Sequence, residues 1–207
     1  MRNMHMLPIP PWVLAAVVVL LGSVCPGQVF EVGMTGGTSL MRNSVLVPTS
    51  QLGSSPSDVT LSDGFRLGFR MTFNSYRFFG HEIGYAYNRT QLDLAGQGKY
   101  GMAAHQGFYD FLVYAAPEGS KIRPFLAGGA QFTNFVPPGA SVTSGGGATK
   151  FGLNYGGGVK ARVGHMFMLR FDLRQYHSPK PDFFNLPGYP QGWLRQVEVS
   201  GGFSVVM

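Results

Sequence analysis

Charged residues and cysteine are both scarce in this chain. Asp, Glu, Lys and Arg make up 13% of the sequence, against roughly 25% in a typical soluble domain. Basic residues outnumber acidic ones by 16 to 10, but no basic run is concentrated anywhere, so a nucleic-acid partner is not expected. A single cysteine excludes a disulfide framework within the chain. Glycine is abundant instead, at 30 residues, and aromatic residues reach 14%. This composition fits β-structure that hides both faces from bulk water.

The N-terminus has the features of a secretory signal peptide. Its apolar run at 12–21 is shorter than the ~20 residues that a membrane-spanning helix needs. Small residues, Cys25 and Gly27, occupy the two positions that matter before a cleavage site. We therefore predict a cleaved signal peptide over 1–27. A retained anchor helix and lipidation at Cys25 are the alternatives, although lipidation would call for a small residue where the chain has Val24.

The clearest strand pattern lies at 167–177. A β-strand sends alternate side chains to opposite faces, whereas a helix would scatter both sets around its circumference. Here one phase is apolar and the other is mostly charged: Phe167, Leu169, Phe171 and Leu173 against Met168, Arg170, Asp172, Arg174 and Tyr176. The segment is therefore predicted to be a strand with one apolar face and one charged face.

The same alternation recurs in seven other segments, and no helical period follows the signal region. The predicted strands are 28–40, 63–73, 82–92, 105–115, 123–135, 150–163, 167–177 and 193–207. Long connections at 41–61, 93–104, 136–149 and 178–192 alternate with short turns at 74–77, 117–120 and 164–166. Short periplasmic turns and longer external loops are typical of outer-membrane barrels. The predicted fold class is all-β, an eight-stranded antiparallel up-and-down transmembrane barrel over 28–207 after an N-terminal signal peptide.

The distribution of charge indicates which face meets lipid. If the charged phase faced outward, six cations would lie against hydrocarbon, each at a cost of ~2–4 kcal/mol near the midplane. A soluble lipocalin-like barrel would instead turn the apolar phase toward a ligand cavity. Phe, Tyr, Leu and Val crowd that phase and leave little room for a cavity, while Gly and Ala in the polar phase suit a narrow interior. The apolar phase is therefore predicted to face lipid.

The inward phase then holds eleven charged side chains. Buried charges must be paired or they cost several kcal/mol each, and an eight-stranded barrel is just wide enough for side chains to fill. We expect an internal charge network that plugs the lumen, with a gated ion path as the alternative. Its members are Glu31, Arg66, Arg70, Glu82, Asp110, Lys160, Arg162, Arg170, Asp172, Arg174 and Glu198.

The chain resembles the family of small eight-stranded outer-membrane barrels related to the OmpA transmembrane domain and OmpX. The likeness covers 28–207 and rests on strand pattern and strand count. It implies a place in the bacterial cell outer membrane, among outer-membrane lipid and lipopolysaccharide, with the barrel-assembly machinery as a partner. Barrels of this family usually end on an aromatic residue, whereas this chain ends on Met207 with Phe203 earlier in the same phase.

No catalytic, cofactor or metal site is expected. His177 and Ser178 are adjacent, so on a strand they point to opposite faces and the histidine cannot activate the serine. No pair of histidines has metal-ligand spacing. We therefore expect a non-enzymatic barrel with a structural role, or a surface-interaction role through four long external loops whose partner the sequence does not identify. A lipid A-modifying enzyme, a small pore and a soluble ligand carrier are the alternatives.

Overall fold

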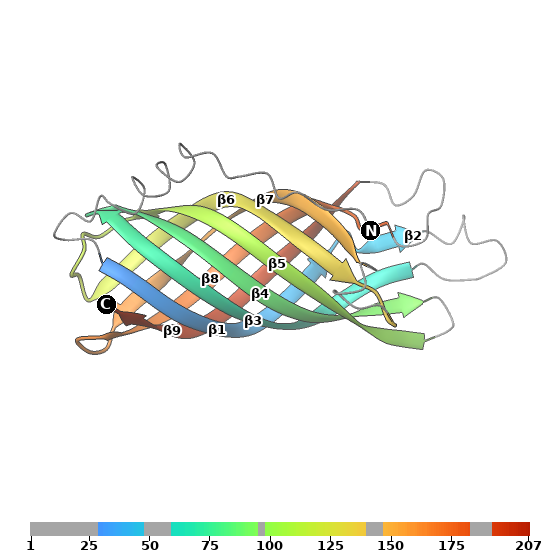
Figure 1. Cartoon of the computed structure of the whole chain (residues 1–207), viewed down its shortest axis with the longest axis horizontal. Helices are drawn as coiled ribbons and strands as arrows, with labels where there is room; N and C mark the ends of the chain where they lie inside the picture. The colour runs from blue at the N-terminus through green and yellow to red at the C-terminus, as the bar shows by residue number, and fades with distance from the viewer. Residues whose placement is uncertain (1–28, 48–58, 95–97, 140–146, 183–191) are drawn as a thin grey trace, which may run out of the picture.

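The computed structural model describes residues 29–47, 59–94, 98–139, 147–182 and 192–207 (Figure 1). The predicted signal peptide lies outside these residues. The described part is built of strands: β1 (Val29–Arg42), β2 (Val45–Val47), β3 (Val59–Tyr76), β4 (Phe79–Leu94), β5 (Gly98–Tyr114), β6 (Ile122–Val136), β7 (Ala148–Arg162), β8 (Phe167–Pro179) and β9 (Trp193–Val206). It contains no helix long and apolar enough to cross a membrane.

Eight of these strands close into a barrel. Each pairs antiparallel with its neighbour in the chain from β3 to β9, and β1 closes the ring by pairing with both β9 and β3. Met34, for example, lies opposite Phe203 on one side and Phe69 on the other. The short strand β2 only adds to the edge of β3. The predicted fold, an eight-stranded antiparallel up-and-down barrel, is confirmed.

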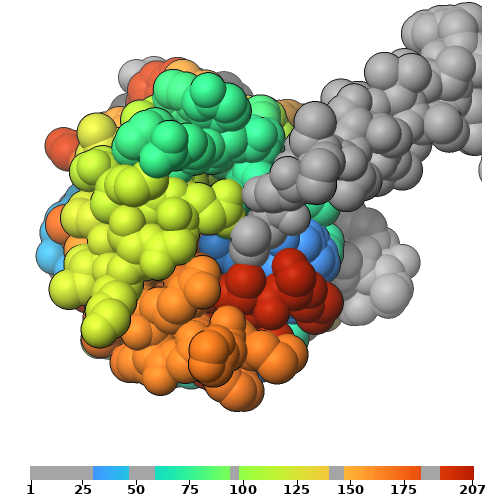
Figure 2. Space-filling model, turned by 90° about the vertical axis from the view of Figure 1, so that its left-hand side faces the viewer, coloured from blue at the N-terminus to red at the C-terminus, as the bar shows by residue number. Residues whose placement is uncertain are grey.

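The short connections gather at one end of the barrel. Figure 2 looks at this end, where the β3–β4, β5–β6 and β7–β8 turns and the end of β9 follow one another around the rim. The opposite end carries the connections that were expected to be long. In barrels of this architecture the short turns are periplasmic and the long connections external, so we call the two ends the turn end and the loop end.

The apolar phase faces outward along the strands. Phe69 is 52% exposed and its neighbour Arg70 is 3% exposed; Phe171 and Asp172 show the same contrast at 63% and 3%. On β9, Val199 is 45% exposed. A soluble barrel would show the reverse pattern, because its apolar side chains would converge on the interior. The exterior is therefore a belt of Phe, Tyr, Leu and Val, as a transmembrane barrel requires.

Two of the four expected long connections differ from the prediction. The 93–104 segment is mostly strand, because β4 and β5 stay paired up to Leu94 and Gly98 and leave only 95–97 outside the described residues. Its glycines favour a loop by sequence, yet Gly101 pairs with Gln91 inside the ladder. The 41–61 segment likewise contributes β2 and the start of β3. The other two expected loops fall largely on 140–146 and 183–191, outside the described residues.

Close strand approach requires glycine at inward positions of β9. A Cβ added to Gly202 would lie 1.9 Å from the backbone oxygen of Met34 and 2.7 Å from the Cα of Thr35. Both neighbours are backbone atoms of the paired strand β1, so they cannot move aside without breaking the ladder. The seam that closes the barrel therefore depends on a residue without a side chain.

We expect Gly202→Leu to lower the free energy of unfolding by at least ~1–3 kcal/mol, the usual cost of overpacking. The measurement is urea unfolding in detergent, followed by tryptophan fluorescence. Gly164→Leu is the matched control, because a Cβ there meets nothing within 4 Å. An unchanged urea midpoint for Gly202→Leu would contradict the close-approach argument.

Candidate functional site

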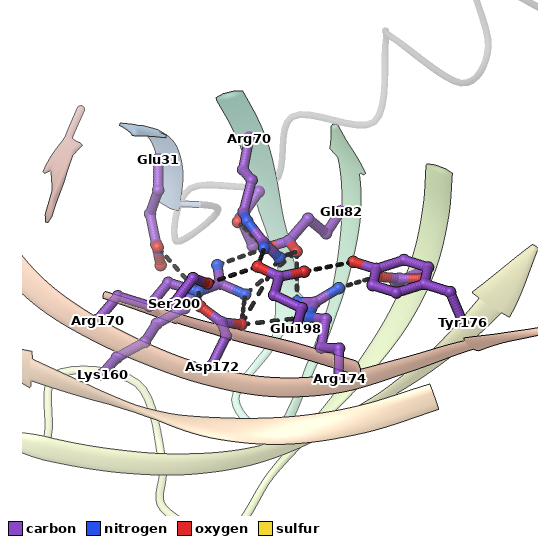
Figure 3. Close-up of polar contacts among 12 residues, drawn as sticks. Glu31, Arg70, Glu82, Lys160, Arg170, Asp172, Arg174, Tyr176, Glu198 and Ser200 are labelled. Atoms are coloured by element: carbon purple, nitrogen blue, oxygen red, sulfur yellow. Dashed lines mark hydrogen bonds and ion pairs between the residues drawn. The ribbon is translucent and has the colours of Figure 1, made fainter. Parts of the chain in front are cut away.

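The interior of the barrel holds a compact group of charged side chains midway between its ends. Figure 3 shows them pointing toward one another from strands on different sides of the ring. The two-residue period of β8 places Arg170, Asp172 and Arg174 in one inward row. Arg70 of β3 and Glu82 of β4 meet this row from across the lumen, and Glu198 projects from β9, the strand next to β8, to pair with Arg70. We call these six side chains the central cluster.

Glu82 is the centre of the cluster. Its carboxylate is fully buried and lies 3.2 Å from Arg70 Nη1, 2.5 Å from Arg170 Nη1 and 2.6 Å from Arg174 Nη2. Thr72 Oγ1 donates a fourth contact to the same carboxylate, at 2.9 Å. A single carboxylate thus joins three guanidinium groups from two strands, and charge-assisted hydrogen bonds of this kind are about twice as strong as neutral ones.

The other carboxylates balance the remaining positive charge. Asp172 lies 2.7 Å from Arg170 Nε and 3.2 Å from Arg174 Nε. Glu198 accepts from Arg70 Nη2 at 2.5 Å and pairs with Arg66 Nε at 3.1 Å.

Asp110 pairs with Arg174 from the opposite side of the lumen. Toward the turn end, Lys160 Nζ lies 2.6 Å from Glu31 Oε2. Ten of the eleven expected interior charges therefore meet an opposite charge, five cations against five carboxylates. Arg162 is the eleventh: it is half-buried at the end of β7 and has no ion-pair partner among the described residues.

Toward the loop end the cluster passes into neutral polar contacts. Arg66 donates to Asn88 Oδ1 at 3.0 Å, to Gln106 Oε1 at 2.5 Å and to Tyr176 Oη at 3.0 Å. Tyr176 Oη in turn donates to Glu198 Oε2 at 2.7 Å. These amide and hydroxyl groups satisfy a buried guanidinium without adding charge, which limits the cost of its burial.

Beyond these polar contacts lies a group of apolar side chains that we call the apolar cap. None of its members is more than 4% exposed: Met41, Leu46, Val59, Leu61, Leu92, Met102, Ala104, Phe135 and Leu194. They come from the loop-end parts of seven strands, counting β2, and close around the interior there. The interior of this barrel is thus lined by apolar side chains at its loop end.

The turn end is closed by a different group, the aromatic floor, made of Leu112, Tyr114, Phe125 and Ala127. Tyr114 Oη accepts from Lys160 Nζ at 3.0 Å. The guanidinium of Arg123 stacks over the Tyr114 ring at 3.7 Å from its centroid, a favourable cation–π arrangement. The interior therefore has three layers: cap, ionic centre and floor.

The alternation of polar and apolar residues does not predict the cap or the floor. On β3 the register shifts between Ser62 and Phe65. Such a bulge reverses the phase, so that the buried residues are Leu61 and Val59. The alternation is lost at this bulge, so the sequence of the 41–61 segment is typical of a loop. On β5 the signal was present, because Leu112 interrupts the polar phase and is fully buried in the floor.

His177 and Ser178 do not come together in the structure. Ser178 is buried on the inner side, whereas His177 lies in the outward phase, 3.3 Å from Tyr155 Oη. No group of three or more His, Cys, Asp or Glu residues among those described could hold a metal ion.

The fold is shared with solved outer-membrane proteins, although the sequence matches no known family model and no curated protein. Neisserial surface protein A is 15% identical, with a TM-score of 0.57 over 85% of this chain and 96% of that one. OprG of Pseudomonas aeruginosa is 13% identical, with a TM-score of 0.55 over 87% and 95%. AlkL, solved in lipid bilayers, is 12% identical, with a TM-score of 0.57 over 100% and 97%. At such low identity these likenesses show the fold, a small membrane barrel.

Replacing Glu82 by glutamine would leave three guanidinium groups short of one buried negative charge. Breaking a buried ion pair from one side costs ~3–5 kcal/mol, so we expect the urea midpoint in detergent to fall sharply. Asp63→Asn is the matched control, because Asp63 is 48% exposed and pairs with Arg42 at 3.5 Å. An exposed ion pair of this kind contributes only ~0–1 kcal/mol to the free energy of unfolding. Equal effects of the two changes would show that the cluster does not stabilise the fold.

Proposed function

We propose that the protein is an integral barrel of the bacterial outer membrane whose lumen is sealed, and that it acts without catalysing a reaction. The outward apolar belt requires a hydrocarbon surrounding, since Phe69 and Phe171 are each more than half exposed on the bare barrel. Closed barrels with an apolar exterior are the β-structures that span membranes. The solved proteins of the same fold, outer-membrane proteins by name, support this location.

The observation that carries the sealed lumen is the charge-balanced central cluster between the apolar cap and the aromatic floor. An ion crossing the barrel would have to separate pairs such as Arg170–Glu82, which lie at hydrogen-bond distance and are fully or almost fully buried. Unpairing a buried charge costs several kcal/mol. The apolar cap and the aromatic floor then oppose hydration at the two ends of the path.

A non-enzymatic role follows from the same interior. The carboxylates that could act as acids or bases, Glu82, Asp172 and Glu198, are held by arginines and have no access to a substrate. The barrel is then a rigid support in the membrane, and the external end is the part free to meet other molecules. Outer-membrane lipid, lipopolysaccharide and the barrel-assembly machinery belong to this proposal as its surroundings and its route of insertion.

The location is tested by fractionating bacterial cells that express the full chain. We expect the mature protein in the outer-membrane fraction, with a gel mobility in detergent that changes on heating, because folded barrels resist denaturation by detergent until heated. Recovery in the soluble periplasmic fraction would overturn the membrane proposal and favour the ligand carrier.

The seal is tested in planar lipid bilayers. Purified, folded protein is expected to insert without producing steady ion current, because the central cluster blocks the path. A general porin added to the same bilayer serves as the positive control for detection. Steady open conductance on the nanosiemens scale would contradict the sealed lumen and support the pore.

A further inference from the structure

The lipid-facing surface changes character at the loop end of β8 and β9. Along the outward phase of β8, Leu173 is followed by Gln175 and His177; along β9, Val197 is preceded by Arg195. These polar side chains lie on the outside of the barrel, next to exposed apolar residues of the belt such as Leu173 and Val199. No lumen function explains them, because they point away from the interior.

Three cationic or titratable residues lie in one row across neighbouring strands. Arg195 is register-paired with Arg42 of β1 on one side and with His177 of β8 on the other. Opposed side chains at such positions have Cβ atoms ~4.5–5.5 Å apart, and like charges placed there destabilise the pair. Asp63 offsets part of the Arg42 charge at 3.5 Å. Arg195 has no such carboxylate among the described residues.

A neutral side chain orients the row. When the Gln175 amide is placed so that its oxygen faces the cations, this oxygen lies 2.6 Å from Arg195 Nη2, 2.8 Å from Arg195 Nε and 3.0 Å from His177 Nε2. The amide nitrogen then donates to Tyr155 Oη at 3.3 Å. The guanidinium is thus held in place while its charge stays uncompensated. We call Arg42, Gln175, His177 and Arg195 the outer cationic row.

Directly below this row, toward the middle of the belt, the surface is hollowed. A concavity of about 330 Å³ is bounded by Tyr155, Gly157, Leu173, Gln175 and Val197. A second one of about 390 Å³ shares Gly157 and Leu173 with it and continues past Phe171 and Val199. The two form one apolar furrow, whose upper edge is Gln175 of the cationic row. Volumes of ~300–1,000 Å³ are usual for ligand sites.

We propose that the outer cationic row and the furrow together bind one phosphorylated lipid of the outer leaflet, with its phosphate on Arg195 and an acyl chain in the furrow. Guanidinium groups bind phosphate with planar, charge-assisted hydrogen bonds, and a phosphate between Arg42 and Arg195 would remove their repulsion. The furrow begins where the row ends, so headgroup and chain of one molecule reach both. This site depends on the proposed membrane location.

Phosphate binding by the outer cationic row is tested with folded protein in detergent. The protein is titrated with lipid A, and binding is followed by native mass spectrometry. We expect Arg195→Gln to weaken lipid A binding roughly tenfold, the effect of losing one charge-assisted contact. Arg89→Gln is the matched control: Arg89 is exposed on β4 toward the same end of the barrel, outside the row. Equal losses in the two variants would overturn the site, as would unchanged binding of lipid A stripped of its phosphates.

Binding of the acyl chain in the furrow is tested by a substitution that fills the furrow. Val197→Phe keeps an apolar side chain against lipid but occupies the concavity, so binding of lipid A should fall while binding of inorganic pyrophosphate does not. Val113→Phe is the control, since Val113 is 42% exposed on β5, away from the furrow. Pyrophosphate that binds as tightly as lipid A, or cross-linking of a second copy of the chain at Val197, would overturn the lipid assignment.

The variants are first checked for outer-membrane fractionation and heat-modifiable mobility. A variant that passes both checks and loses lipid A supports the site. A wild-type chain that fails the fractionation check refutes the proposed location, whereas a correctly located wild-type barrel that binds no lipid A refutes the site alone.

Discussion

The structure depends on the balance of charge inside a tube too narrow for bulk water. Four arginines and a lysine inside the barrel each meet a carboxylate within 3.2 Å, and a fifth buried arginine, Arg123, stacks on Tyr114 instead. Each of these cations would cost several kcal/mol if left unpaired, so the pairs stabilise one arrangement of the strands around them. Because Glu82 joins arginines from both β3 and β8, the same contacts link opposite walls of the barrel.

The exterior obeys the opposite requirement, and the two together explain the composition. Side chains such as Leu126, 69% exposed, meet lipid, and ionic ones are kept for the interior, so the chain carries few charges. Glycine allows neighbouring strands to approach closely where a side chain would collide with the paired backbone, as Gly202 does against β1. The outer cationic row is the clearest departure, and its position at one end of the belt is where lipid headgroups would lie.

Much of the fold is predictable from the sequence, because the strand period is two, and all eight barrel strands were predicted, although the short edge strand β2 was not. The inward set from Glu31 to Glu198 followed from alternation alone. The errors arose where alternation breaks. The bulge near Ser62 reverses the phase of β3, and the glycines near Gly101 lie in paired strand. Both errors concern the loop end, where the apolar cap is formed by contacts between segments distant in the chain.

The sequence by itself determined the fold class, the number of strands and which face of each strand is ionic, because these depend only on the order of polar and apolar residues along each strand. Tertiary structure decided which charges pair with each other. It also left Arg162 outside the network and placed Arg195 beside Arg42. Those outcomes depend on register and on closure of the ring, which bring together side chains from opposite ends of the chain that no local pattern connects.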